Sequence, residues 1–166
     1  QFNPAFIKIP STISTHTHTL DHVARDSDLG IVVSLGMTEN DYLSETLNRF
    51  RNHKTLYILQ CTSAYPAPEN ELNLKLIHKL RNTGATPGYS SHDDGSLGSM
   101  LAVAAGAKMI EKHVTSDGAE WVERNDVALN LDRGDFKDFV GNIRHAEEMM
   151  GSGKPRITKS ENHKYD

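Results

Sequence analysis

The sequence predicts an α/β fold built on a parallel β-sheet, and two observations carry this prediction. Five short apolar runs, rich in β-branched and aromatic residues, recur along the chain. The stretches between them have helical periodicity and are long enough for βαβ crossovers, which join parallel strands. Because the runs are apolar throughout, we expect the strands to be buried on both faces. A doubly wound sheet and a barrel both fit this pattern.

The expected strands all end in polar residues. In chain order they are Phe6–Pro10, Ile31–Ser34, Leu56–Cys61, Pro87–Ser90 and Lys108–Val114. In both candidate folds, ligands bind where the carboxyl ends of parallel strands converge. Small hydroxyls, a lysine or a histidine stand at the end of every run. A shared binding site at this edge of the sheet is therefore predicted.

The first predicted helix follows the second strand. Leu43, Leu47 and Phe50 fall at positions i, i+4 and i+7 of one helical face. Thr38, with Asp41 three residues later, forms a capping-box pattern and is expected to start this helix.

Three further helices are predicted beyond the third strand. A leucine stripe over residues 72–80 is followed by Gly84, which is expected to end the helix, and residues 100–104 form a short helix with small side chains. The last helix ends at Gly151, and its apolar face consists of Phe136, Phe139, Val140, Ile143 and Ala146.

The composition fits one globular domain. The chain has 166 residues, 37% hydrophobic and 24% charged, with a formal net charge of −4 at pH 7. No apolar run approaches the roughly 20 residues of a membrane-spanning helix. The lysines are spread along the chain rather than clustered, which argues against a nucleic-acid-binding surface. Because Cys61 is the only cysteine, an intrachain disulfide is excluded and a reducing, cytoplasmic location is expected. Residues 152–166 are polar, without periodicity, and are expected to form a tail or linker.

His92 and His113 are the pair at the strand ends that most clearly indicates a metal site. They follow neighbouring strands, which lie about 4.8 Å apart in a sheet, so two imidazoles can reach one metal ion. His92 shares strand parity with Ser90, so both side chains are expected to point the same way. The remaining histidines are expected on the surface: His16, His18, His22, His53, His78, His145 and His163.

A lysine and several serines on converging loops predict an anion site. Lys8 supplies charge, while hydroxyls and backbone N–H groups supply donors. Gly36 and Gly88 would let the backbone approach a phosphate closely. The chain has no Walker or G-x-G-x-x-G motif, which argues against a nucleotide site. Cys61 has no evident base beside it and is expected to be buried and unreactive.

At these residues the sequence resembles the sialic acid synthase (N-acetylneuraminate synthase) family, whose members condense phosphoenolpyruvate with an N-acetylhexosamine. The matching segments follow the family's order: F-I-K-I-P-S (6–11), V-V-S-L-G-M (32–37), C-T-S-A-Y-P-A-P (61–68), N-L (73–74), G-Y-S-S-H (88–92), G-A-K-M-I-E-K-H (106–113) and I-R-H-A-E-E-M-M-G (143–151). The resemblance implies a partial TIM (β/α)8 barrel, with about the last five βα units of the barrel in residues 1–151.

The resemblance also implies which residues bind phosphoenolpyruvate. Lys8, Ser11 and Ser34 would contact its phosphate, and Ser63 and Ser90 would hold its carboxylate. The implied product is a nonulosonic (sialic) acid plus phosphate, formed without a covalent enzyme intermediate.

The sugar and metal side of the implied site involves other residues. Lys8, Tyr65 and Asp126 would be the catalytic residues, with Tyr65 and Asp126 on the side of the amino sugar or its phosphate ester. His92 and His113 would hold a divalent ion, Mn²⁺ or Mg²⁺, which acts as a Lewis acid.

The sequence departs from the family's pattern mainly on the sugar side. Ile13 replaces an acidic residue, Ser91 replaces the acid of an S-D-H motif, Leu35 replaces a common threonine, and residues 121–126 replace a P-G-P-D stretch. These differences predict an acceptor other than N-acetylmannosamine. A catalytically inactive barrel fragment that acts as a binding or assembly module is the alternative, and a metal-dependent aldolase or hydrolase is a third hypothesis.

The chain is short for a complete barrel, which needs eight strands and about 250 residues. An open five-stranded sheet would expose two edges and part of an apolar interior. We therefore expect either a complementing N-terminal barrel segment or a second copy of the chain, in a homo-oligomer, to cover it.

Overall fold

The computed structural model describes residues 2–118 and 127–161. Its main feature is a parallel five-stranded sheet in the order β1–β2–β3–β4–β5. The strands are β1 (Phe6–Ile9), β2 (Gly30–Ser34), β3 (Leu56–Cys61), β4 (Thr86–Ser91) and β5 (Met109–Lys112). The order in the sheet equals the order in the chain, as in a barrel rather than in a doubly wound sheet.

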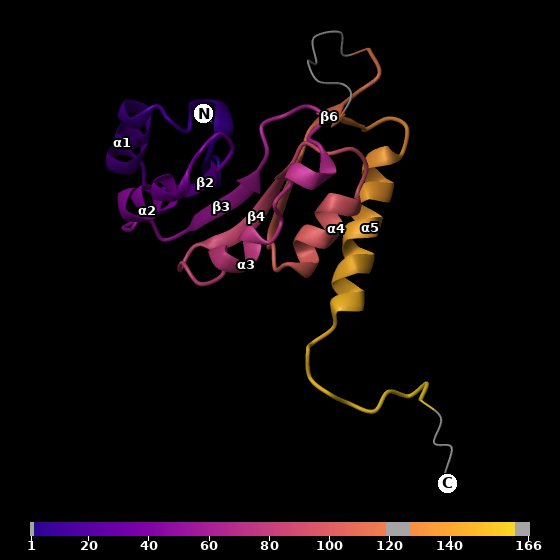
Figure 1. The fold of residues 1–166 in the computed structure, drawn as a ribbon. Coiled ribbons are helices and arrows are strands. Elements are labelled where there is room, and N and C mark those ends of the chain that lie inside the picture. The colour runs from indigo at the N-terminus through magenta and orange to yellow at the C-terminus, as the bar shows by residue number, and fades with distance from the viewer. Residues whose placement is uncertain (1, 119–126, 162–166) are drawn as a thin grey trace.

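Helices alternate with these strands. They are α1 (Thr17–Asp26), α2 (Asn40–Arg49), α3 (Leu76–Leu80), α4 (Leu97–Ala104) and α5 (Asp135–Met150). The remaining described elements are two single-turn 3-10 helices, η1 (Ser11–Ile13) and η2 (Glu69–Glu71), and a small parallel pair, β6 (Val114–Thr115) and β7 (Leu129–Asn130). The helices follow one another along the sheet from α1 to α5 (Figure 1).

One face of the sheet forms the apolar core with the first two helices. Side chains alternate between the faces of a strand, so Ile9, Ile31 and Val33 lie on the same face. They form a buried cluster with Leu20 of α1 and Phe50 at the end of α2. Burying such a side chain stabilises the fold by about 1.5–3 kcal/mol.

The same face carries the next two helices. Tyr89 of β4 is completely buried and forms a cluster with Ile77 of α3 and Ala102 of α4. Ile58 of β3 is buried with Leu80 of α3. Since α1 to α4 all pack on one face, the sheet is a half-barrel with its helices outside, and the predicted partial TIM barrel is confirmed.

The opposite, concave face changes from apolar to polar along the strands. Near the amino ends, Phe6, Val32 and Met109 line an apolar hollow of about 470 Å³. Two positions later in each of these strands, the same face carries the polar side chains of the candidate site. The sheet therefore presents its chemistry at the carboxyl ends of its strands.

Helix α1 lies between β1 and β2, where the sequence predicted no helix. Leu20 is completely buried, and Val23 and Ala24 are half-buried, so residues i, i+3 and i+4 form an apolar stripe against the sheet. Histidine and threonine, which surround this stripe in the sequence, have weak helix propensities. The sequence pattern therefore did not predict a helix here. Tertiary packing of Leu20 outweighs that weak propensity.

The predicted capping box is also wrong. Glu39, not Thr38, precedes the first turn of α2, and its side chain makes no capping hydrogen bond. The Thr38 hydroxyl instead donates to the Leu35 carbonyl at 2.5 Å. Thr38 therefore stabilises the loop after β2 rather than the helix.

Only the second half of the leucine stripe over residues 72–80 is helical, as α3. Asn73 has φ 47°, a left-handed conformation that asparagine tolerates but that a helix cannot contain. Residues 72–75 therefore form a turn between η2 and α3. Gly84, at φ 85°, lies in the turn beyond Arg81, the C-cap of α3.

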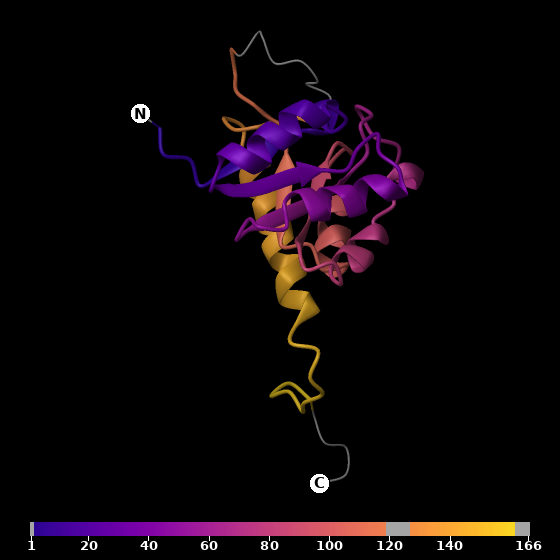
Figure 2. The same cartoon turned by 90° about the vertical axis from the view of Figure 1, so that its left-hand side faces the viewer.

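The described chain continues beyond its last helix, α5. Helix α5 ends at Met150, and Gly151, with φ 57°, is its C-cap. Residues 152–161 contain no helix or strand and are exposed, and they leave the body of the fold beyond α5 (Figures 1 and 2).

The strand expected over Lys108–Val114 divides instead into β5 and β6, which belong to different sheets.

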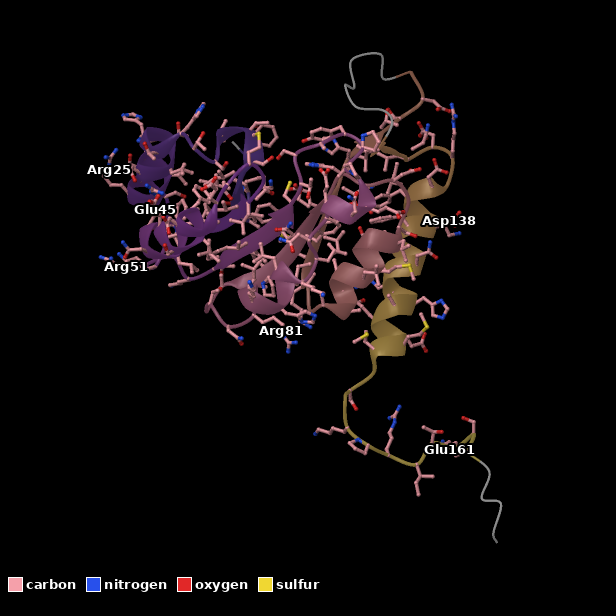
Figure 3. The ribbon with its side chains drawn as sticks, viewed as in Figure 1. Arg25, Glu45, Arg51, Arg81, Asp138 and Glu161 are labelled. Atoms are coloured by element: carbon pink, nitrogen blue, oxygen red, sulfur yellow. The ribbon has the colours of Figure 1, made fainter. Side chains whose placement is uncertain are left out.

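Several charged side chains lie on the outer surface. Arg25, Arg51 and Arg81 point away from the body of the fold in Figure 3, as does Asp138 of α5. Within residues 2–118 and 127–161, no helix is both long and apolar enough to cross a membrane.

Candidate functional site

A cavity of about 380 Å³ lies at the carboxyl ends of the strands. Residues from β1, β2, β4 and β5 and from the loops after β1, β3, β4 and β5 line it. The lining residues are Lys8, Pro10, Ser11, Thr12, Ser34, Tyr65, Ser90, Ser91, His92, Glu111, Lys112 and His113. Of the residues predicted for a site, Lys8, Ser11, Ser34, Tyr65, Ser90, His92 and His113 are brought together here.

Lys8 is the cationic centre of the cavity. Its Nζ donates to Ser34 Oγ at 2.9 Å and forms an ion pair with Glu111 Oε1 at 3.2 Å. Ser90 Oγ donates to the same Glu111 oxygen at 2.6 Å. Lys8 and Glu111 belong to the two edge strands, so this ion pair crosses the concave face. The Lys8 ammonium and the hydroxyls of Ser34 and Ser90 form a donor set suited to a multivalent anion.

Ser11 and Ser63 form a second hydroxyl pair beside Lys8. Ser63 Oγ donates to Ser11 Oγ at 2.7 Å. Gly36 makes this contact possible, because a Cβ at that position would lie 2.1 Å from Ser63 Oγ. Ser63 lines the neighbouring cavity rather than this one, so it reaches the site through Ser11.

Gly88 has a different role from the predicted one. A Cβ at Gly88 would lie 2.2 Å from Leu59 Cδ2 and 2.8 Å from the Met109 carbonyl oxygen. The missing side chain therefore makes room for the neighbouring strands inside the half-barrel. In contrast, Gly36 does lie at the predicted anion site.

The two histidines meet across the ends of β4 and β5. Their ring centroids are 5.2 Å apart, and Tyr65 lies against both rings at 4.1 Å from His92 and 5.5 Å from His113. His92 Nδ1 lies 2.8 Å from the Thr62 carbonyl oxygen. Since a carbonyl only accepts, Nδ1 carries the proton in this bond, and Nε2 of the neutral ring keeps its lone pair.

The histidine pair could hold a divalent metal ion. Burial lowers the pKa of His92, which favours the neutral ring that a metal ligand requires. The bond to Thr62 is the kind of outer contact that orients a metal-binding imidazole. Within the described part of the chain, no group of three or more His, Cys, Asp or Glu residues is arranged to hold a metal, so this pair could supply two protein ligands.

Cys61 lies buried beneath the polar cluster. Its Sγ is 3.7 Å from His92 Nδ1, and burial raises the pKa of the thiol. A thiol with a raised pKa is a poor nucleophile. The expectation of a buried cysteine is confirmed.

Two charged residues of the cavity were not predicted to have roles. Glu111 and Lys112 both come from β5, immediately before His113. Strand alternation gives a signal for Glu111, because it shares parity with His113 and therefore faces the concave side. No sequence pattern indicates that Lys112, of opposite parity, also reaches the cavity.

Other predicted residues lie elsewhere. Asp126 and the rest of 121–126 are outside the described residues, as is His163. His53 is half-buried rather than on the surface, with Nδ1 3.2 Å from the Leu29 oxygen and Nε2 3.3 Å from the Ala24 oxygen. It packs edge-on against Phe50 with ring centroids 5.5 Å apart, which accounts for its burial.

The family model that matches this chain is described as the NeuB family, and it covers residues 1–155. An uncharacterized protein of Methanocaldococcus jannaschii is 38% identical over 91% of this chain and 44% of its own length. A pseudaminic acid synthase of Campylobacter jejuni and an N,N'-diacetyllegionaminic acid synthase of Legionella pneumophila are each 34% identical over 93% of the chain and 45% of their own length. The chain thus spans less than half the length of these curated relatives.

Solved structures resemble the fold over almost the whole chain. The N-acetylneuraminic acid (sialic acid) synthetase of Leptospira borgpetersenii, in complex with citrate, aligns with a TM-score of 0.83 and 28% identity over 94% of this chain and 54% of that one. The spore coat polysaccharide biosynthesis protein spsE of Bacillus subtilis aligns with a TM-score of 0.78 and 29% identity, over 94% and 44%.

Proposed function

This chain belongs to the NeuB family, and from that premise we propose that it is the carboxyl-terminal barrel part of a nonulosonic acid synthase. The proposed reaction is the condensation of phosphoenolpyruvate with an N-acetylated hexosamine, or its phosphate ester, to a nonulosonic acid plus phosphate. One observation carries the proposal: an anion-binding donor set and a pair of imidazoles line the same cavity. The names of the relatives support the same class of reaction.

We propose that Lys8, with Ser11 and Ser34, binds the phosphate of phosphoenolpyruvate. The Lys8 ammonium and the hydroxyls can donate to phosphate oxygens, and they stabilise the charge that grows on phosphate as it leaves. In this assignment Ser90 holds the carboxylate of phosphoenolpyruvate. Ser63 assists it and reaches the cavity through its hydrogen bond to Ser11. The Glu111 carboxylate now accepts from Lys8 and Ser90, so it must release these donors when the substrate anion binds.

The sugar side is proposed to involve Tyr65 and the histidines. Tyr65 lies against both imidazoles and would pack along the acceptor sugar. His92 and His113 would hold a Mn²⁺ or Mg²⁺ ion, which supplies Lewis-acid polarisation of the sugar's carbonyl oxygen. No nucleophilic residue is required, which agrees with the raised pKa of Cys61. Asp126 is retained as the third proposed catalytic residue.

The acceptor is proposed to differ from N-acetylmannosamine. Ile13 replaces an acid on the sugar side, and in the structure it packs against the apolar cluster of Ile9 and Leu20. Ile13 is not among the residues that line the cavity, and isoleucine offers no acceptor to a sugar hydroxyl. The related pseudaminic and diacetyllegionaminic acid synthases are named for products other than N-acetylneuraminate, which supports this direction.

We propose that the remaining strands of the barrel complete the site. Strands β1 and β5 each pair with only one neighbour in the described sheet. The apolar hollow beside β5 is lined by Phe6, Val32 and Phe139, and exposed apolar surface of this kind favours a covering partner. The chain spans less than half of its relatives, so further βα units of the same family are the occupant that fits.

The test is phosphate release from phosphoenolpyruvate, with Mn²⁺, against a panel of N-acetylated hexosamines and their phosphate esters. The chain is supplied with the complementing barrel segment of a family member. Release that depends on both the sugar and Lys8 supports the proposal, and Lys8→Met is the negative control. If no phosphate is released with any of the sugars, the proposed enzyme activity is wrong.

A binding or assembly module is the second candidate, favoured by Ile13 at the sugar side. It predicts that the completed barrel binds phosphoenolpyruvate by calorimetry but releases no phosphate. The same samples therefore separate the two candidates.

A further inference from the structure

Lys112 connects the two segments that carry the histidines. It directly precedes His113, and its Nζ donates to Ser91 Oγ at 3.0 Å and to the carbonyl oxygen of Asp93. These two acceptors flank His92 on either side in the chain. One ammonium group on β5 thus holds both neighbours of His92 on the end of β4.

We propose that Lys112 is a positioning residue that fixes the separation of the His92 and His113 rings. The proposal rests on the metal site proposed above. It assigns Lys112 no contact with substrate: the side chain acts through Ser91 and Asp93 on the loop that carries His92.

The acceptors of Lys112 are themselves held in place. Ser91 and Asp93 are buried. Asp93 Oδ1 accepts from Ser91 Oγ at 2.7 Å and from Tyr89 Oη at 2.6 Å, and Tyr89 lies in the core beneath α4. The loop after β4 is therefore anchored to the core at one side and to β5 through Lys112 at the other.

Gly98 shows how closely Asp93 fits against α4. A Cβ at Gly98 would lie 2.2 Å from Asp93 Oδ2, so the carboxylate occupies the space that a side chain would need. Because the network is buried, removal of the Lys112 donors leaves acceptors unsatisfied. The loop can recover those bonds only by moving toward water, and that movement carries His92 away from His113.

Other contacts already fix His92 on its opposite side. Its Nδ1 is bonded to the Thr62 carbonyl oxygen after β3, which orients the ring but does not connect it to β5. Backbone pairing of β4 and β5 ends at Ser91 and Lys112 in the described register. The Lys112 side chain therefore continues the connection between the two strands by one residue, to the position where the histidines begin.

The experiment compares this chain with its Lys112→Met variant, and Lys108→Met is the matched control. Lys108 is an exposed lysine at the start of the same segment. Two readouts are recorded: NOEs between the His92 and His113 ring protons without metal, and Mn²⁺ affinity by calorimetry. We expect Lys112→Met to lose the NOEs and to bind Mn²⁺ on the order of tenfold more weakly, with a circular dichroism spectrum like that of the unmodified chain. Lys108→Met should keep both properties.

The outcomes separate this inference from the proposed function. A folded Lys112→Met variant with unchanged NOEs and unchanged Mn²⁺ affinity overturns the positioning role but leaves the metal site standing. An unmodified chain that binds no Mn²⁺ overturns the metal site, and the inference with it. If Lys112→Met does not fold, Ser91→Ala decides, because it removes one of the two acceptors: weaker Mn²⁺ binding supports the role, and unchanged binding overturns it.

Discussion

The histidines show how single residues acquire a shared function from strand geometry. His92 and His113 continue two paired strands at equal parity, so their rings meet 5.2 Å apart although they are one crossover apart in the chain. Lys8 and Glu111 meet by a different route, across the concave face between the edge strands. Both contacts lie at the carboxyl edge of the sheet.

Replacing either imidazole should remove the proposed metal site. His92→Ala and His113→Ala are each expected to abolish Mn²⁺ binding measured by calorimetry, because two protein ligands become one. His78→Ala, an exposed histidine on α3, should bind as the unmodified chain does. Retained Mn²⁺ affinity in both His92→Ala and His113→Ala would rule out this pair as the metal ligands.

Tyr89 predicts a loss of stability at alkaline pH. Burial, assisted by the Asp93 carboxylate, raises the pKa of Tyr89 well above its ordinary value of 10.0. The unfolded chain releases this proton near pH 10 while the folded chain keeps it, so the stabilisation is present below pH 10 and is lost as the pH rises further. Urea unfolding at a series of pH values should show the free energy of unfolding falling above that point.

The Tyr89→Phe variant isolates this effect. Phenylalanine cannot titrate, so its free energy of unfolding should fall less steeply above pH 10 than that of the unmodified chain. The variant also loses the bond to Asp93 and should be less stable at neutral pH by about 1–3 kcal/mol. Parallel curves above pH 10 would contradict the assignment of the alkaline loss to Tyr89.

At the scale of elements, α1 illustrates how packing fixes a helix that its residues only weakly favour. Its first turn contains threonine and histidine, and no side chain caps it. Leu20 holds it to Ile9 and Ile31 of the sheet. In contrast, α5 has acidic residues in its first turn and glycine at its end, and both features are visible in the sequence.

Leu20→Ala should therefore destabilise the chain strongly. Truncation of a completely buried leucine costs about 2–5 kcal/mol, which urea unfolding measures directly. His18→Ala, an exposed position on the same helix, is expected to change the free energy of unfolding by less than about 0.5 kcal/mol. Similar losses from both variants would mean that helix propensity, rather than the Leu20 contact, holds α1.

At the scale of the whole molecule, the half-barrel leaves edge strands and an apolar hollow beside β5. A parallel edge presents unpaired N–H and C=O groups that attract another strand. The same edges frame the site, because Lys8 comes from β1 and Glu111 from β5. Closure of the barrel and completion of the site are therefore one event in the proposed function.

Co-expression with the complementing barrel segment of a family member should convert the chain into a monodisperse complex. Hydrogen exchange of the β5 amides is expected to slow in that complex, because strand pairing protects them. Light scattering and exchange measured by NMR report both effects. A complex of two copies of this chain with the same protection would instead favour pairing between identical chains.

The sequence by itself determined that the sheet is parallel and at which edge its polar residues gather. Apolar runs of strand length, each followed by hydroxyls, Lys8 or a histidine, fix both features locally, because parity and crossover length need no distant contact. His92, Ser90 and Lys8 could be placed at one site for this reason.

Only the tertiary structure decided the contacts between segments distant in the chain. The ion pair of Lys8 with Glu111 depends on the curvature of the sheet, and the bonds of Lys112 to both neighbours of His92 depend on the path of the loop after β4. Helix α1 exists because Leu20 is buried. Each of these is a packing result, and packing energies exceed the local preferences that a sequence pattern records.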